Sequence, residues 1–200
     1  MLGVGVVAIA LTGVIFNQSR KEIARVFHLP PIGRDLKNYD KPLTQMIGVS
    51  PIDKNRISLL VEKSKYRLTV YYGERAVKSY PIVLGGNPTD DKRQEGDSCT
   101  PEGRFRIIKA YPHDRWSKFL WLNYPTRDSW AKHNKAKLAG KISQEASIGS
   151  EIGIHGVPSG CDNYITTGMN WTAGCISLKI KDIDEIYTVV QAGSDVEIVR

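Results

Sequence analysis

Residues 155–158 of this chain read His-Gly-Val-Pro, and residues 170–178 read Asn-Trp-Thr-Ala-Gly-Cys-Ile-Ser-Leu. Together they pair an imidazole, His155, with a thiol, Cys175. A nucleophilic cysteine needs such a neighbour, because a thiol with a pKa of about 8.5 is mostly protonated at neutral pH. A glycine beside each residue allows close approach of the backbone, and the N–H groups of Gly174 and Cys175 are candidates for an oxyanion hole. The pattern predicts a cysteine nucleophile with a histidine base.

These runs resemble the catalytic signature of the L,D-transpeptidases, whose YkuD-type domain remodels bacterial peptidoglycan. Residues 152–178 follow the order I-G-I-H-G-V-P-x-G, a variable loop, then W-T-A-G-C-I-S-L. Residues 100–105 match the T-P-x-G-x-F segment of that domain, and residues 122–125 resemble its tyrosine segment. The likeness covers roughly residues 55–200. It implies a mainly β fold, a YkuD-like β-sandwich or mixed β-sheet with a few short helices, preceded by an N-terminal membrane segment.

The resemblance also implies a reaction. Cys175 would attack the carbonyl before the terminal D-alanine of a peptidoglycan stem tetrapeptide and form a thioester, which an amine resolves as a 3-3 crosslink or a protein attachment. His155 would take the thiol proton, and the backbone carbonyl of Gly156 would hold the imidazole. No cofactor and no metal are expected. The expected substrate-binding residues are Tyr124, Trp171, Thr172 and Ser177, although Trp171 is equally consistent with core packing.

The chain departs from the common family motif at two positions. Ala173 stands where the motif has a second histidine, and Ser177 stands where it has an arginine. Two alternatives therefore stay open: an L,D-carboxypeptidase or amidase on the same scaffold, and a non-catalytic cell-wall-binding module. A metal site using His155, Cys161 and Cys175 is disfavoured, because these spacings match no ordinary ligand set.

Composition limits the class of protein. The 200 residues carry 28 basic and 21 acidic side chains, a net charge of +7, which favours an anionic partner. No signature of a nucleic-acid-binding fold accompanies this charge, so no nucleic-acid partner is expected. Three cysteines suit neither a disulfide-dense scaffold nor a zinc framework. With Cys175 as nucleophile, Cys99 and Cys161 are either a disulfide pair or two free thiols.

The chain divides into three parts by pattern. Residues 2–16 contain no charge, so residues 1–18 are expected to be a membrane anchor or signal segment. We favour an uncleaved anchor over a cleaved signal peptide, and a buried core helix is disfavoured. Residues 19–54 have a mixed, proline-bearing composition and are expected to be a linker. Residues 55–200 form the expected catalytic domain, placed outside the cytoplasmic membrane in the periplasm. The basic residues at positions 20–25 favour the opposite orientation by the positive-inside rule.

Alternating apolar and polar residues predict strands in the expected catalytic domain. The predicted strands are 56–62, 66–72 and 76–84, which form a β-meander, followed by 105–109, 119–123 and 196–200.

Two further segments have other patterns. A helix is predicted from Asp182, with Glu185 completing a capping box and Gly193 ending it. The lysine-rich residues 131–141 are interpreted as a solvated loop or short helix rather than a lid over the substrate.

Overall fold

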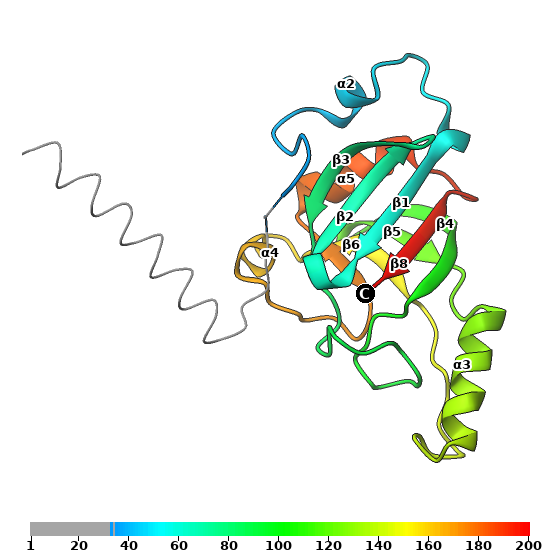
Figure 1. Ribbon diagram of the computed structural model, residues 1–200. Helices are drawn as coiled ribbons and strands as arrows, with labels where there is room; N and C mark the ends of the chain where they lie inside the picture. Colours follow the sequence, from blue (N-terminus) through cyan, green and yellow to red (C-terminus); the bar gives the residue numbers. More distant parts are fainter. Residues whose placement is uncertain (1–32, 34) are drawn as a thin grey trace, which may run out of the picture. The chain divides into compact units, whose positions relative to one another are not determined.

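The computed structural model describes residue 33 and residues 35–200, and these form one curled, eight-stranded mixed sheet with a few short helices (Figure 1). The order of strands across the sheet is β3-β2-β1-β8-β4-β5-β6-β7. The strands are β1 (Ile57–Glu62), β2 (Arg67–Tyr72), β3 (Arg75–Pro81), β4 (Gly103–His113), β5 (Ser117–Leu122), β6 (Gly153–Gly156), β7 (Ile176–Leu178) and β8 (Asp195–Val199). The helices are α2 (Leu43–Ile47), α3 (Arg127–Leu138), α4 (Asn163–Thr167) and α5 (Ile180–Val189), with 3-10 turns η1 (Lys54–Arg56) and η2 (Lys63–Lys65). The predicted mainly β fold is confirmed.

The first three strands form the predicted meander, and the alternation of side chains is strict in β1. In β1, Ile57, Leu59 and Val61 are buried while the residues between them are only partly covered. β1 pairs with β2, and β2 with β3, in antiparallel fashion. The last strand, β8, lies between β1 and β4, parallel to the first and antiparallel to the second. The C-terminal strand therefore completes the middle of the sheet.

The sheet curls until its two edges meet. β4 is longer than the predicted strand and carries a register irregularity between Ile107 and Lys109, where it passes from pairing with β8 to pairing with β5. Beyond the end of β3, Val83 exchanges two hydrogen bonds with Ser177 of β7, both 2.9 Å long. The strand predicted over 76–84 thus ends at Pro81 in its pairing with β2 and then crosses to the opposite edge.

The capping box predicted for helix α5 is not formed. It begins at Ile180 after Lys179, which is two residues before Asp182, and ends at Val189. The two carboxylates that suggested a capping box have tertiary partners instead: Asp182 accepts from the Tyr39 hydroxyl at 2.8 Å, and Glu185 binds groups on β3. Gly193 does not end the helix but lies in the turn before β8. The predicted start of the helix was wrong because Asp182 and Glu185 bind residues far away in the sequence and do not cap the helix.

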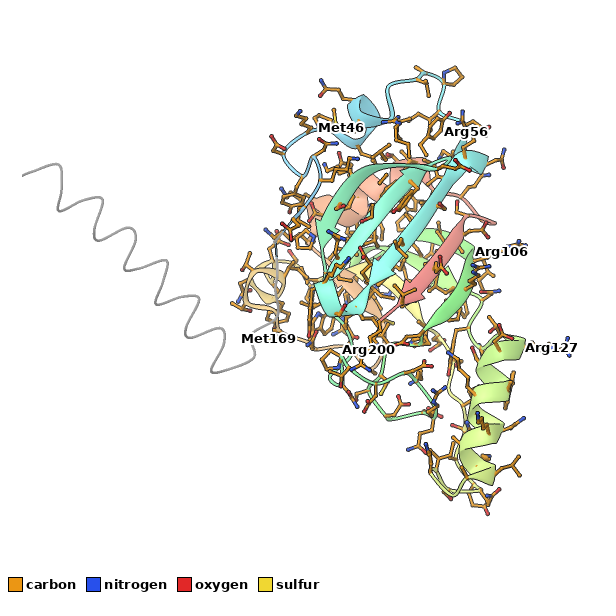
Figure 2. The ribbon with its side chains drawn as sticks, in the orientation of Figure 1. Met46, Arg56, Arg106, Arg127, Met169 and Arg200 are labelled. Carbon is orange, nitrogen blue, oxygen red and sulfur yellow. The ribbon has the colours of Figure 1, made fainter. Side chains whose placement is uncertain are left out.

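The segment expected to be a linker packs against the domain where the structure describes it. Leu43 and Ile47 of α2 have exposed fractions of 0% and 2% and join the main core. The expected membrane segment, residues 1–18, lies outside the described residues. Within the part that is described, every helix is too short or too polar to cross a bilayer. The lysine-rich run lies mostly in α3, which stands apart from the strands (Figure 1), with Arg127 at its start (Figure 2).

A buried ion pair attaches α5 to the meander. Lys78 of β3 is 4% exposed, and its ammonium donates to Glu185 at 2.6 Å and to the Lys41 carbonyl at 2.6 Å. Replacing Glu185 with alanine leaves the lysine buried without its counter-ion. We expect Glu185→Ala to lower the free energy of unfolding by about 3 kcal/mol, measured by urea titration.

The matched control removes an exposed carboxylate. Glu197 pairs with Arg104 at 3.3 Å, and both side chains are open to solvent. Glu197→Ala is expected to change the free energy of unfolding by less than about 1 kcal/mol. Equal losses in the two variants would contradict a special role for the buried pair.

Candidate active site

The parallel pairing of β6 with β7 brings the two candidate catalytic residues to one face of the sheet. Ile154 pairs with Ile176 and His155 with Ser177. Cys175 directly precedes β7, so the same register sets it beside Gly153. Because side chains alternate along a strand, His155 and Cys175 emerge on the same face of neighbouring strands. Residues twenty apart in sequence thus become near neighbours.

The imidazole of His155 is oriented by its own neighbour in sequence. Its Nδ1 lies 2.8 Å from the carbonyl oxygen of Gly156. A carbonyl can only accept, so Nδ1 carries the proton and Nε2 keeps its lone pair. This is the tautomer that a general base needs. The predicted contact between His155 and the Gly156 carbonyl is present.

Aromatic side chains surround this imidazole. The Trp116 ring is stacked on it with centroids 4.3 Å apart, and the Phe119 ring lies parallel to it at 5.6 Å. Trp171 meets it edge-on at 5.6 Å. His155 is 2% exposed, and burial lowers its pKa to about 4, against the opposing effect of the Gly156 hydrogen bond. The imidazole is therefore neutral at pH 7.

The thiol of Cys175 is neutral at pH 7 as well. Burial raises its pKa to about 11; the Gly153 backbone and the charge of Lys92 act in the opposite direction, and the charge of Glu151 adds to the rise. The sulfur lies 3.6 Å from the Glu151 carbonyl oxygen, a weak hydrogen bond. The site thus holds a thiol beside an imidazole rather than a preformed ion pair, so proton transfer must accompany attack.

The turn before Cys175 is shaped by Thr172 and Gly174. The Thr172 hydroxyl donates to the Cys175 carbonyl at 2.7 Å and accepts from the Gly174 N–H at 3.2 Å. Gly174 has φ +142°, and a Cβ there would lie 2.6 Å from the Cys99 carbonyl oxygen, so only glycine fits. Of the two predicted oxyanion donors, the Gly174 N–H is already taken by Thr172. The Cys175 N–H donates to no group in the described part of the chain.

The predicted substrate-binding residues fall into two places. Trp171, Thr172 and Ser177 gather around the histidine and cysteine, but Ser177 is fully buried in β7 and Thr172 is occupied by the turn. Tyr124 is 5% exposed, packs near Phe105, and donates its hydroxyl to the Ile148 carbonyl at 3.0 Å. In this structure the tyrosine hydroxyl is used inside the protein rather than offered to a substrate. Ala173, at the position of the missing histidine, is exposed.

Sequence reasoning missed Trp116, Phe119 and His113. They lie in or beside the connection from β4 to β5, where a tryptophan between two strands resembles ordinary packing. The His113 ring stacks on Trp116 at 4.3 Å, so the aromatic cluster extends away from the base. Only the pairing of β5 with β6, which sets Phe119 opposite His155, brings this cluster to the site.

All three cysteines of the chain lie among the described residues, and each is a free thiol. The Cys99–Cys161 disulfide, one of the two states left open above, is not formed. The Cys99 thiol instead lies 3.3 Å from the Asp97 carbonyl, and the residue is buried. In the described part of the chain, no three histidine, cysteine, aspartate or glutamate side chains are grouped to hold a metal ion.

Comparisons with known proteins show the family and the fold of the chain. Residues 56–198 match the YkuD family model, described as the L,D-transpeptidase catalytic domain. Among solved structures, the chain resembles the helical cell shape determining protein Pgp2 from Campylobacter jejuni, with 24% identity and a TM-score of 0.54 over 78% of this chain and 53% of that one. It also resembles Bd1075 from Bdellovibrio bacteriovorus, with 19% identity and a TM-score of 0.50 over 72% and 48% of the two chains. At these identities the likeness shows the fold alone, and the chain spans about half the length of these structures. No curated protein matches the chain.

The raised pKa of the thiol predicts how Cys175 is alkylated. Because only the thiolate reacts, the iodoacetamide rate at Cys175 should rise about tenfold for each pH unit from 7 to 10, measured by peptide mass spectrometry. The control is Cys175 in the chain unfolded with urea, whose ordinary thiol pKa of about 8.5 makes the rate level off above about pH 9.5. A Cys175 rate that is constant between pH 6 and 8 would mean a preformed thiolate and contradict the neutral pair.

The lowered pKa of His155 predicts a pH-dependent stability. In the unfolded chain His155 has an ordinary histidine pKa of about 6.5, whereas in the folded chain it binds a proton only near pH 4. Stability from the neutral imidazole is therefore complete above pH 6.5 and is lost as the pH falls toward 4. Between these values the wild-type protein should lose roughly 3 kcal/mol more free energy of unfolding than His155→Phe, measured by urea titration. Parallel pH profiles for the two proteins would contradict the assignment.

Proposed function

The chain belongs to the YkuD family of L,D-transpeptidase catalytic domains, and from this premise we propose that it is a peptidoglycan-modifying cysteine acyltransferase. The observation that carries the proposal is the pairing of β6 with β7, which sets the Cys175 thiol on the same face as an imidazole whose Nδ1–H is held by the Gly156 carbonyl. The substrate class is a stem tetrapeptide with a terminal D-alanine. The acyl group passes through a Cys175 thioester to an amine.

Acylation begins with the thiol leaving the Glu151 carbonyl and turning toward His155. Nε2 of His155 takes the thiol proton as the sulfur attacks the carbonyl before the terminal D-alanine. The Cys175 N–H is the backbone donor free to stabilise the oxyanion. The attack gives a tetrahedral intermediate. When it collapses, the C–N bond to the terminal D-alanine breaks, and His155 returns the proton to the departing D-alanine amine.

Deacylation reverses the proton path. An acceptor amine attacks the thioester, its proton passes to His155, and the thiol leaves with that proton restored. The proposed acceptor is the amine of a second stem peptide or of a protein. Water at the same position would make the protein an L,D-carboxypeptidase. The exposed Ala173 and the buried Ser177 supply no charged group to hold the acceptor, so the choice depends on the other walls of the site.

The proposed location is the cell envelope, with residues 1–18 anchored in the cytoplasmic membrane and the domain outside. The uncharged run over residues 2–16 supports the anchor. Protease added to intact spheroplasts should degrade the domain. Protection of the domain until the cells are lysed would overturn this placement.

The test of the activity is incubation of the full chain in detergent with purified tetrapeptide muropeptides, followed by mass analysis. We expect loss of D-alanine and new 3-3 crosslinked dimers. Cys175→Ala should reduce the rate by at least about 10³-fold, since the nucleophile is removed. Cys161→Ala, which removes a thiol outside the reacting pair, should remain active.

The products distinguish the remaining readings. If the products are tripeptides without crosslinked dimers or amine adducts, the activity is that of a carboxypeptidase and not of a transferase. Binding to sacculi with unchanged muropeptides would replace the enzyme by a wall-binding module. Carbapenem labelling of the wild type that persists in Cys175→Ala would overturn the nucleophile.

A further inference from the structure

The ring of Trp116 lies between two imidazoles. His113 and His155 each stack on it at a centroid distance of 4.3 Å, with interplanar angles of 10° and 25°. Two rings this close to one indole must occupy opposite faces, because on one face they would overlap. Neither the Trp116 nor the Trp171 indole N–H, both buried, has a hydrogen-bond partner among the described residues. Stacking rather than hydrogen bonding therefore orients the Trp116 ring.

The backbone of Trp116 holds the same histidine from another side. Its carbonyl accepts from the Gly156 N–H at 3.1 Å and from the Lys118 N–H at 2.7 Å. The Gly156 carbonyl in turn receives the Nδ1 proton of His155. A Cβ on Gly156 would lie 2.6 Å from the Trp116 oxygen, so the close contact requires glycine. Residue 156 is thus fixed by Trp116 at its N–H and fixes the base at its carbonyl.

We propose that Trp116 is the positioning residue of the base, holding the His155 ring by stacking and the Gly156 peptide by a hydrogen bond. This inference rests on the proposed function of His155. Where the common motif has a charged arginine and a second histidine, this chain has Ser177 and Ala173, and an aromatic wall surrounds the base instead. Trp116 stacks on the base, so it acts on catalysis through His155.

Stacking also keeps water away from the base. The imidazole is covered by Trp116 on one face, while Phe119 and Trp171 lie on other sides. The titratable groups around the imidazole are Cys175 and His113, and a charge on His113 would oppose protonation of His155. On the neighbouring elements, Lys118 of β5 forms an ion pair with Asp184 of α5 at 3.3 Å. Removing the indole admits water to the covered face. Water favours the charged imidazolium, so protonation becomes easier.

The experiment follows His155 directly, by NMR titration of its ring carbon in the full chain. In Trp116→Ala the His155 pKa should rise by at least about one unit toward 6.5, and in Trp116→Phe it should stay within about half a unit of wild type. Trp116→Gln, which admits water without emptying the space, should shift the pKa in the same direction as alanine and is the second variant if Trp116→Ala does not fold. With muropeptides, Trp116→Ala and Trp116→Gln should lower kcat at least about tenfold with little change in KM.

Trp130→Ala is the matched control. Trp130 is an exposed indole of α3 that meets another buried histidine, His133, edge-on at 5.7 Å. This variant should leave the His155 pKa and kcat unchanged. A His155 pKa that is the same in Trp116→Ala, Trp116→Gln and wild type, or a Trp116→Phe variant that behaves like Trp116→Ala, would overturn the proposal. The titration needs no turnover, so a failed activity with a shifted pKa would overturn the proposed function and leave the positioning role standing.

Discussion

The parallel pairing of β6 with β7 is the constraint on which the rest of the site depends. Parallel neighbours need a long crossover connection, and residues 157–175 supply it, carrying α4 and the turn before the thiol. The twenty-residue interval between His155 and Cys175 is therefore a consequence of strand direction. Figure 2 shows Met169 of this connection beside α4 at the edge of the molecule, and its side chain is 48% exposed.

The loop between β3 and β4 packs against the turn that precedes Cys175. Lys63 is 1% exposed, and its ammonium donates to the Asp90 carbonyl at 2.6 Å, the Thr100 carbonyl at 3.1 Å and Glu102 at 3.0 Å. A lysine so buried is tolerated because all three of its protons have acceptors. The loop that it anchors carries Cys99, whose carbonyl contacts Gly174.

Aromatic rings surround the base in this chain, which lacks the second histidine and the arginine of the common family motif. Ser177 cannot replace an arginine clamp, since it is fully buried in β7. An aromatic wall gives little electrostatic help to a thiolate, and it makes protonation of the imidazole harder. The result is an imidazole that stays neutral well below pH 7 and a thiol that is also neutral at pH 7.

The sequence by itself determined the strands of the meander, the family, and the identities of the histidine and the cysteine. These depend on local alternation and on a contiguous motif, which a linear reading can detect. Only the tertiary structure decided where α5 begins, because Glu185 is held by Lys78 across the core rather than by its own helix terminus. The contact between Trp116 and His155 was likewise decided only by the tertiary structure, because it requires β5 to pair with β6. The candidate nucleophile, Cys175, lies in a contiguous sequence motif. The surroundings that set its protonation and that of His155 come from strands far apart in the chain.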